Sequence, residues 1–147
     1  MKPLRIGLLG IGTVGGGTFD VLARNAEEIS RRAGRPITIT HVADKNTTLA
    51  NQVVAGRAVV TDDAFALVKN PDIDVIIELI GGYTIAKQLM LEAINNGKHV
   101  VTANKALLAL HGNEIFGAAR AKGVIVAFEA AVAGGIPIIK ALREGLV

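Results

Sequence analysis

A glycine-rich turn near the start of the chain constrains its fold more than any other feature. The hexapeptide Gly10–Gly15 reads GIGTVG, which matches the pattern GxGxxG, and it lies between an apolar run at Leu4–Leu9 and a stretch with helical spacing. In such a strand–turn–helix unit the first glycine permits a tight turn, the second lets the backbone approach a pyrophosphate, and the third lets helix and strand pack closely. The sequence therefore predicts that Gly10, Gly12 and Gly15 form a dinucleotide-binding loop. The alternative is a turn of the same shape without a ligand.

Short β-branched runs alternate with longer helical stretches along the rest of the chain. Near-continuous apolar strands, each followed by a helix, are typical of a parallel sheet covered on both faces. We therefore expect an α/β fold of the Rossmann type, a doubly wound parallel sheet with helices on both faces. The expected strands are residues 4–9, 37–43, 58–60, 74–80, 99–102 and 124–128. The expected helices are residues 13–33, 62–69, 84–96, 104–122 with a break near Gly112, and 136–147. The polar stretch at residues 44–57 is assigned no element.

Composition excludes several classes of protein. The chain has 147 residues, of which 50% are hydrophobic, enough for one buried core. It has no Cys, which excludes disulfides and thiolate metal sites. The net charge of +3 is dispersed and there are only four Phe and one Tyr, so we expect no nucleic acid partner. No run reaches the about 20 apolar residues of a membrane helix, so we expect no membrane partner and a cytoplasmic protein.

The residues at the end of the second expected strand bear on the choice of cofactor. Asp44 stands where an acidic residue accepts hydrogen bonds from the ribose 2′-hydroxyl of NAD, and Lys45 follows it directly. A cation at this place favours the 2′-phosphate of NADP instead. The two residues favour different cofactors, so the sequence does not decide between NAD and NADP. A solvated turn is the alternative for both residues.

Two charged residues stand close to the ends of later strands. Lys105 follows the strand at 99–102, at the edge of an open α/β sheet where ligands bind. A lysine there can hold a carboxylate, polarise a carbonyl oxygen or move a proton, although a solvated lysine at a helix start is the commoner case. Glu78 interrupts an apolar strand, and we expect a structural carboxylate bonded to backbone N–H groups rather than a catalytic base.

Four motifs together resemble the homoserine dehydrogenase family: Gly10–Gly17, Glu78–Gly82, Thr102–Ala106 and Glu129–Pro137. They follow the family's order across the whole chain. The resemblance implies NAD(P)-dependent interconversion of L-homoserine and L-aspartate 4-semialdehyde, small-molecule substrates of threonine and methionine biosynthesis, by a homodimer. It also implies that residues 1–133 form the NAD(P)-binding domain and that residues 134–147 begin a substrate and dimerisation domain, the remainder of which is absent. We therefore expect the chain alone to be inactive.

The resemblance also assigns roles to single residues. It places Thr13 and Val14, with the loop glycines, against the dinucleotide, and it places Ala43 and Lys45 at the adenosine end. It identifies Lys105 as the lysine close to the nicotinamide and the substrate. The family binds a monovalent cation such as sodium in a loop that maps to Glu129, Val132, Gly134 and Ile136. Most of these positions offer only backbone carbonyl oxygens, which suit a hard cation; the alternative is a plain hinge.

Two rival functions remain open from the sequence. Another Rossmann dehydrogenase, of the sugar-oxidoreductase type, shares the segment GKHV before a lysine. That group typically reads EKP where this chain has Asn104-Lys105-Ala106, which counts against it. A dinucleotide-sensing module without catalysis is the second rival.

Overall fold

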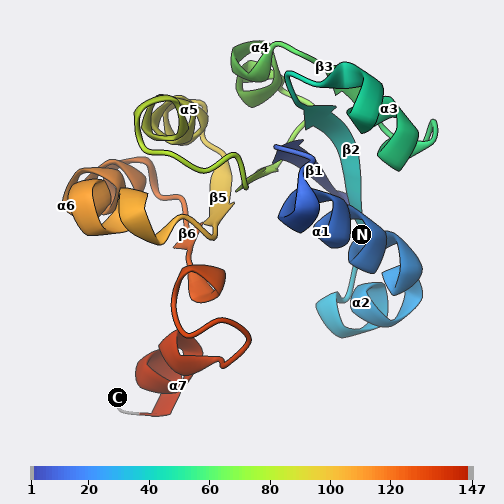
Figure 1. Cartoon of the computed structure of the whole chain (residues 1–147). Helices are drawn as coiled ribbons and strands as arrows, with labels where there is room; N and C mark the ends of the chain where they lie inside the picture. Colours follow the sequence, from blue (N-terminus) through green and yellow to red (C-terminus); the bar gives the residue numbers. More distant parts are fainter. Residues whose placement is uncertain (1, 146–147) are drawn as a thin grey trace.

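The fold is a parallel sheet between two layers of helices. Its strands are β1 (Leu4–Leu9), β2 (Ile37–Ala43), β3 (Val59–Thr61), β4 (Val75–Glu78), β5 (His99–Thr102) and β6 (Val126–Ala127). A computed structural model describes residues 2–145 and places these six strands in the order β3-β2-β1-β4-β5-β6, with every neighbouring pair parallel (Figure 1). The chain starts in β1, winds outward through β2 and β3, and then returns to place β4 on the other side of β1.

The helices lie on both faces of this sheet. On one face are α1 (Thr13–Arg24), α2 (Ala26–Ala33) and α3 (Thr47–Val54); on the other are α4 (Ala64–Lys69), α5 (Thr84–Asn95) and α6 (Lys105–Lys122). Beyond β6, a 3₁₀ turn η1 (Glu129–Ala131) leads to α7 (Ile138–Gly145). The predicted doubly wound α/β fold of the Rossmann type is confirmed. None of the helices in residues 2–145 combines the length and the apolar composition that crossing a membrane requires.

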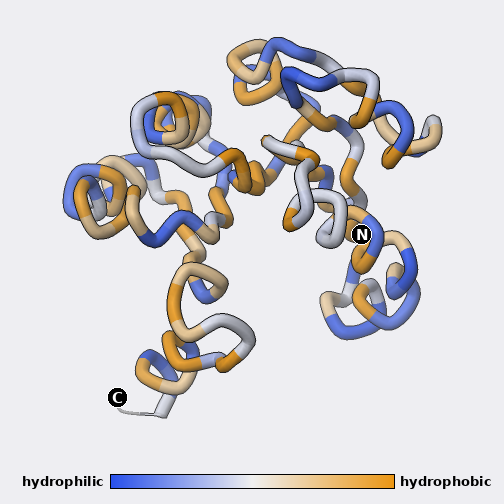
Figure 2. The backbone as a smooth tube through the Cα atoms, in the orientation of Figure 1, coloured by the Kyte–Doolittle hydropathy of each residue, from blue (hydrophilic) through white to orange (hydrophobic). Residues whose placement is uncertain are grey.

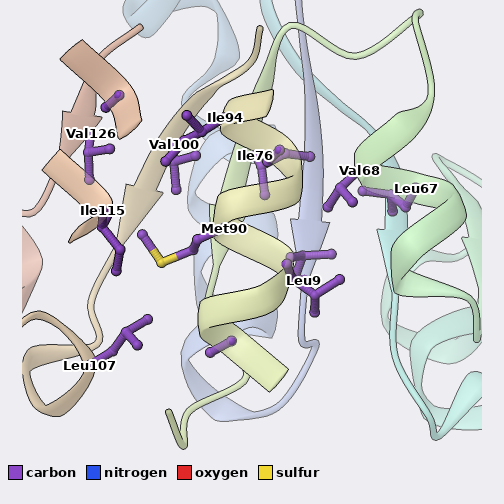
Figure 3. Packing of buried hydrophobic residues seen from close by; sticks show 14 of the residues in the cluster. Leu9, Leu67, Val68, Ile76, Met90, Ile94, Val100, Leu107, Ile115 and Val126 are labelled. Carbon is purple, nitrogen blue, oxygen red and sulfur yellow. The ribbon is translucent and has the colours of Figure 1, made fainter. Parts of the chain in front are cut away.

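Two apolar clusters hold the layers together. Figure 3 shows the cluster in which Met90 of α5 and Ile115 of α6 pack with Ile76 of the sheet. On the opposite face, Phe19 of α1 packs with Leu8 of β1. Hydrophobic and hydrophilic residues alternate along the surrounding helices (Figure 2), and α1, α3, α4, α5 and α6 contribute buried residues to the two clusters. Full burial of each large apolar side chain contributes about 1.5–3 kcal/mol, and this packing fixes where the loops at the carboxyl ends of the strands lie.

A polar cluster closes the opposite edge of the sheet, where the strands begin. Lys98 is buried, and its Nζ donates to the carbonyl oxygens of Asn70 and Ile73 at 2.6 and 2.7 Å. Burial lowers the pKa of Lys98 below its ordinary value, although the charge of Asp74 opposes the shift. Asp74 in turn accepts a hydrogen bond from the backbone N–H of Arg5 at 2.9 Å. The buried lysine thus has a structural role at this edge.

One expected helix, over residues 13–33, is in fact two. α1 ends at Arg24 and α2 begins at Ala26, with Asn25 between them at φ −106° and ψ 21°. The side-chain Nδ2 of Asn25 donates to the carbonyl oxygen of Val21 at 2.9 Å, and its backbone N–H donates to the same oxygen at 3.0 Å. An Asn side chain that bonds to the backbone in this way competes with the helical pattern. The prediction of an unbroken helix was therefore wrong.

Helix α3 lies in a stretch for which the sequence predicted no element. Asn46 is its N-cap, and the side-chain Oδ1 accepts a hydrogen bond from the N–H of Leu49 at 3.0 Å. Ala50 and Val54, four residues apart, are its buried positions. An Asn before apolar residues at this spacing is a helix signal, and the polar residues around it concealed the pattern.

Three further boundaries differ from expectation. α6 runs through Gly112 without a break, so the expected interruption was wrong. β6 is confined to Val126–Ala127, within the longer run expected there. α7 begins at Ile138, directly after Pro137, and the last two residues of the helix expected over 136–147 lie outside the described residues.

The continuity of α6 predicts the effect of a methyl group at its buried glycine. Gly112→Ala should raise the free energy of unfolding by about 0.5–1 kcal/mol, because alanine loses less backbone entropy in a helix than glycine. The added Cβ would lie 3.4 Å from the nearest ring atom of Phe116, an ordinary contact. Urea denaturation followed by circular dichroism measures the change. Gly117→Ala, on the exposed face of the same helix, is the control and should give a similar gain. A loss of stability at Gly112 alone would show that the packing beside Phe116 does not accommodate the methyl group.

Candidate functional site

The glycine loop lies where β1 ends and α1 begins. Gly10 has a φ of +91°, and its N–H donates to the carbonyl oxygen of Ala43 at 2.9 Å. A Cβ at Gly10 would lie 2.9 Å from the carbonyl oxygen of Leu79, and one at Gly15 would collide with the carbonyl oxygen of Gly10. At Gly12, in contrast, no atom lies within 4 Å of an added Cβ. The protein's own packing requires Gly10 and Gly15, whereas the space beside Gly12 is open to a ligand.

The start of α1 offers backbone N–H groups without a side-chain cap. Its N-cap is Gly12, and its first turn has no acidic residue. Helices α3, α4 and α6, in contrast, are each capped by a side-chain oxygen, from Asn46, Asp63 and Asn104. The first N–H groups of a helix lack partners within the helix, and the positive end of its dipole attracts anions. The start of α1 can therefore bind a phosphate group beside the open space at Gly12.

Asp44 follows β2 and holds the glycine loop in place. Its Oδ2 accepts a hydrogen bond from the N–H of Ile11 at 2.7 Å, and its Oδ1 accepts one from the N–H of Asn46 at 2.8 Å. The carboxylate thereby joins the loop to the end of β2 and the start of α3, a role that the sequence did not reveal. Each oxygen can accept more than one hydrogen bond, so this role leaves Asp44 able to bind a ribose hydroxyl as well.

The neighbours of Asp44 lie at the same edge of the sheet. Ala43 is buried, and its carbonyl oxygen is the one that holds Gly10. Lys45 is exposed, and its Nζ donates to the carbonyl oxygen of Asp62 at 3.3 Å. An ammonium group has three donors, so this contact leaves Lys45 able to bind an anion at the carboxyl ends of β2 and β3.

A hollow of about 310 Å³ lies on the other side of the glycine loop. Lys105, the first residue of α6, lines it together with Val14 of α1, and the side chains of both are exposed. β2 lies on one side of β1 and β4 on the other, so Asp44 and Lys45 are separated from this hollow by the loop itself. The hollow is lined by Val14, Glu78, Leu79, Gly81, Ala103, Asn104, Lys105 and Ala106.

Glu78, the last residue of β4, is fully buried at this hollow. Its Oε1 accepts hydrogen bonds from the N–H groups of Ile80 at 3.0 Å and Gly81 at 3.3 Å, and its Oε2 accepts one from the hydroxyl of Thr102 at 2.7 Å. Buried carboxylates need such donors because desolvation of an unpartnered charge is costly. The expectation of a structural carboxylate bonded to backbone N–H groups is confirmed.

Asn104 fixes the start of the helix that carries Lys105. Its Oδ1 caps α6 by accepting a hydrogen bond from the N–H of Leu107 at 3.1 Å, and its Nδ2 donates to the carbonyl oxygen of Gly82 at 2.5 Å. Its own N–H donates to the hydroxyl of Thr102 at 3.0 Å. Asn104 is not among the site residues predicted from the sequence. An Asn three residues before a buried Leu at a helix start was the available signal.

Glu129, one of the four predicted cation ligands, caps the helix that follows. Its Oε1 accepts a hydrogen bond from the N–H of Ile139 at 2.8 Å, and its Oε2 accepts one from the N–H of Lys140 at 2.9 Å. Both bonds lie at the start of α7, where a negative charge also complements the helix dipole. The carboxylate thus fixes α7 to η1.

The other three predicted cation ligands lie in the loop between η1 and α7. Among the described residues the carbonyl oxygens of Val132 and Gly134 accept no backbone hydrogen bond, whereas that of Ile136 accepts one from Ile138 at 2.8 Å. Residues 2–145 contain no cluster of three or more His, Asp or Glu side chains that could hold a metal ion. A site formed by backbone carbonyls does not need such a cluster, so the cation site stays a prediction.

The strand order and the loop together define the class of this protein. The winding of the sheet reverses between β1 and β4, and the glycine loop with its uncapped helix lies at this reversal. Open α/β sheets bind their ligands at such a point. The chain is a nucleotide-binding domain of the Rossmann class.

Comparison with known proteins narrows this class. The family model described as "Homoserine dehydrogenase, NAD binding domain" matches residues 10–129. A homoserine dehydrogenase of Pseudomonas aeruginosa is 64% identical, over 99% of this chain and 33% of the relative, and one of Neisseria gonorrhoeae is 62% identical with the same coverage. The crystal structure of a homoserine dehydrogenase from Thiobacillus denitrificans matches with a TM-score of 0.94 and 62% identity, over 99% of this chain and 34% of that one.

The chain belongs to the homoserine dehydrogenase family, a family of oxidoreductases. It spans about a third of the length of the relatives that it matches. The family match also argues against the rival dehydrogenase of the sugar-oxidoreductase type.

Proposed function

We propose that this chain is the cofactor-binding part of an NAD(P)-dependent homoserine dehydrogenase, which interconverts L-homoserine and L-aspartate 4-semialdehyde in threonine and methionine biosynthesis. The observation that carries the proposal is the uncapped start of α1 beside the open space at Gly12, which suits the pyrophosphate of a dinucleotide. The proposed assembly is a cytoplasmic homodimer. Residues 1–133 are the proposed cofactor domain, and residues 134–147 begin the substrate and dimerisation domain.

In this proposal the two sides of the glycine loop divide the dinucleotide between them. The loop N–H groups, including that of Thr13, hold the pyrophosphate. The adenosine half extends toward Ala43, Asp44 and Lys45 at the end of β2, and the nicotinamide half extends toward the hollow beside β4. The bound dinucleotide supplies the hydride acceptor or donor, and the protein's contribution is to bind, orient and move a proton.

Lys105 is the proposed catalytic residue. It lies at the rim of the hollow, at the first position of a helix that Asn104 fixes. From there its ammonium group can bind the substrate oxygen and hold or deliver a proton at that atom. Hydride transfer demands close alignment of the reacting carbons, so a lysine on a rigid helix start also orients the substrate.

We further propose a monovalent cation, such as sodium, in the loop after η1. The ligands would be backbone carbonyl oxygens among Glu129, Val132, Gly134 and Ile136. The donors fit such an ion, because two of these carbonyls have no backbone partner among the described residues and hard cations bind oxygen ligands. The cation would stabilise the loop that leads into α7.

Two alanine variants of the glycine loop test the cofactor proposal. Gly12→Ala adds a methyl group that meets no protein atom within 4 Å, so its stability should stay near that of the wild type. Affinity for the dinucleotide should fall at least about tenfold, because the methyl group occupies the space of the pyrophosphate. Gly15→Ala collides with Gly10 and should lose stability and affinity together. Calorimetric titration with NADPH and NADH, together with thermal unfolding, measures both quantities.

The control for these variants is Gly117→Ala, which makes the same chemical change on α6, away from the loop. It should bind as the wild type does. Full affinity in a folded Gly12→Ala variant would show that the phosphate does not lie at this helix start.

Removal of the positive charge of Lys45 should affect the binding of NADPH and NADH differently. Lys45→Ala should weaken NADPH about 10- to 100-fold, because a charge-assisted contact to a phosphate contributes about 1.5–3 kcal/mol. NADH has no 2′-phosphate, so its affinity should change little. Titration of both cofactors measures the difference, with Lys122→Ala, an exposed lysine at the end of α6, as the control. Equal losses for both cofactors would place Lys45 away from the 2′-phosphate.

The role of Lys105 is testable in a chimaera that joins this chain to the remaining part of the Pseudomonas aeruginosa relative. Lys105→Ala should lower kcat/KM about 10²- to 10⁴-fold, as expected for loss of a group that acts on the reacting atoms. The dissociation constant of the dinucleotide should change much less, because the loop backbone holds the pyrophosphate. Lys105→Arg should restore little, since a guanidinium differs in shape and stays protonated.

The chain alone serves as the control in this experiment, and it should bind the dinucleotide without turning over homoserine. Wild-type kcat/KM in Lys105→Ala would show that this lysine is only a solvated helix residue. A chimaera that binds the dinucleotide but never turns over homoserine would favour a sensing module instead.

A further inference from the structure

Glu78 carries a buried charge at the point where the winding of the sheet reverses. It ends β4, and its register partners are Leu9 at the end of β1 and Thr102 at the end of β5. Its side chain is 0% exposed, yet it is among the residues that line the hollow with Lys105. The proposed function gives this carboxylate no part in the reaction.

The surroundings of Glu78 are those of an ionised carboxylate. Its three hydrogen-bond partners are all donors: the N–H groups of Ile80 and Gly81, and the hydroxyl of Thr102. The Thr102 oxygen accepts from the N–H of Asn104, which leaves the hydroxyl proton for Glu78. Within residues 2–145, no Lys, Arg or His forms an ion pair with Glu78. The donors solvate the charge without neutralising it.

The placement of the dinucleotide in the proposed function brings its nicotinamide ring near this charge. With the pyrophosphate at the glycine loop and the adenosine at the β2 side, the other half of the molecule extends over the ends of β1 and β4. Glu78 ends β4 there, directly beneath the turn that lines the hollow. The nicotinamide ring carries a positive charge when oxidised and none when reduced.

We propose that Glu78 determines which oxidation state of the cofactor this site prefers, by favouring the oxidised, positively charged ring. This inference rests on the proposed function. A charge buried in the protein acts through a lower effective dielectric than an exposed one. Lys105 has the opposite sign at the same hollow, but its side chain is exposed and solvent screens its charge. At an effective dielectric of about 20, the attraction between a carboxylate and a unit positive charge in the same hollow corresponds to a preference on the order of tenfold in affinity.

A purely structural role for Glu78 predicts a different result. The carboxylate holds the Ile80–Gly81 turn, so damage to that turn would weaken both oxidation states by the same factor. Loss of the carboxylate charge, in contrast, removes an attraction that only the oxidised ring experiences, because the reduced ring is uncharged and the phosphates carry the same charge in both forms. The ratio of the two dissociation constants therefore separates electrostatic selection from support of the turn.

The experiment measures the dissociation constants of NADP⁺ and NADPH, and of NAD⁺ and NADH, for the wild type and for Glu78→Gln. Glutamine has the same shape and can still accept the two backbone hydrogen bonds. We expect Glu78→Gln to weaken the oxidised forms about tenfold while the reduced forms stay within about twofold. Glu114→Gln, which removes a carboxylate from the exposed side of α6, is the matched control and should leave the ratio unchanged.

A second variant covers the case in which Glu78→Gln does not fold. It is Glu78→Asn, which also removes the charge and keeps a side-chain oxygen as an acceptor for the Ile80–Gly81 turn, whereas an apolar residue would leave those N–H groups without a partner. The same shift in the ratio is expected. Equal losses for oxidised and reduced forms, or no change in a folded variant, would overturn the inference and leave the proposed function intact. A wild-type chain that binds neither form would overturn both.

Discussion

The site depends on one close contact, in which the start of α1 lies against the end of β1. A side chain at Gly15 would collide with the carbonyl oxygen of Gly10, so the helix can begin this near the strand only with glycine there. The approach directs the uncapped N–H groups of α1 over the carboxyl edge of the sheet. The proposed phosphate site is therefore a product of backbone packing, in which N–H groups of the main chain rather than side chains would bind the anion.

Polar side chains then fix the loops that this contact leaves at the edge. Asp44 bonds to the backbone of the glycine loop, Glu78 to the turn after β4, and Asn104 to both α6 and Gly82. Each satisfies backbone groups that would otherwise lack partners at strand ends and helix starts. The same bonds order the site before a ligand arrives, which reduces the entropy lost on binding. A carboxylate at a site edge can thus serve the fold and the ligand together.

The parallel sheet and the turn at Gly10–Gly15 were predictable from the sequence, because apolar strand runs and a GxGxxG turn are local signals. Helix boundaries were not predictable where the conformation or hydrogen bonds of a single residue determine the course of the backbone. The non-helical backbone conformation of Asn25, whose side chain bonds to the Val21 carbonyl oxygen, divides one expected helix into two. The cap of Asn46 starts a helix in a stretch in which polar residues concealed the helical pattern. At Gly112 the error was the opposite one, because a break was expected where the helix is continuous. The packing of α6 on α5 keeps the helix intact although glycine is a poor helix former. The hydrogen bond between Asn104 and Gly82 joins residues far apart in the sequence, so no local sequence pattern predicts it.

In the proposed function, the exposure of Lys105 limits what this lysine alone can contribute to catalysis. An ammonium group in contact with solvent is screened, and its interaction with a developing charge on a substrate oxygen is weak in a medium of high dielectric. Exclusion of water from the hollow would strengthen that interaction several-fold without any movement of the lysine. The relatives are about three times as long as this chain, and the hollow at Lys105 is open. Buried Glu78 needs no such cover, because its charge is already shielded from water. In the proposed function, preference for one oxidation state of the cofactor can therefore reside in this domain, while acceleration of the reaction depends on exclusion of water from the hollow at Lys105.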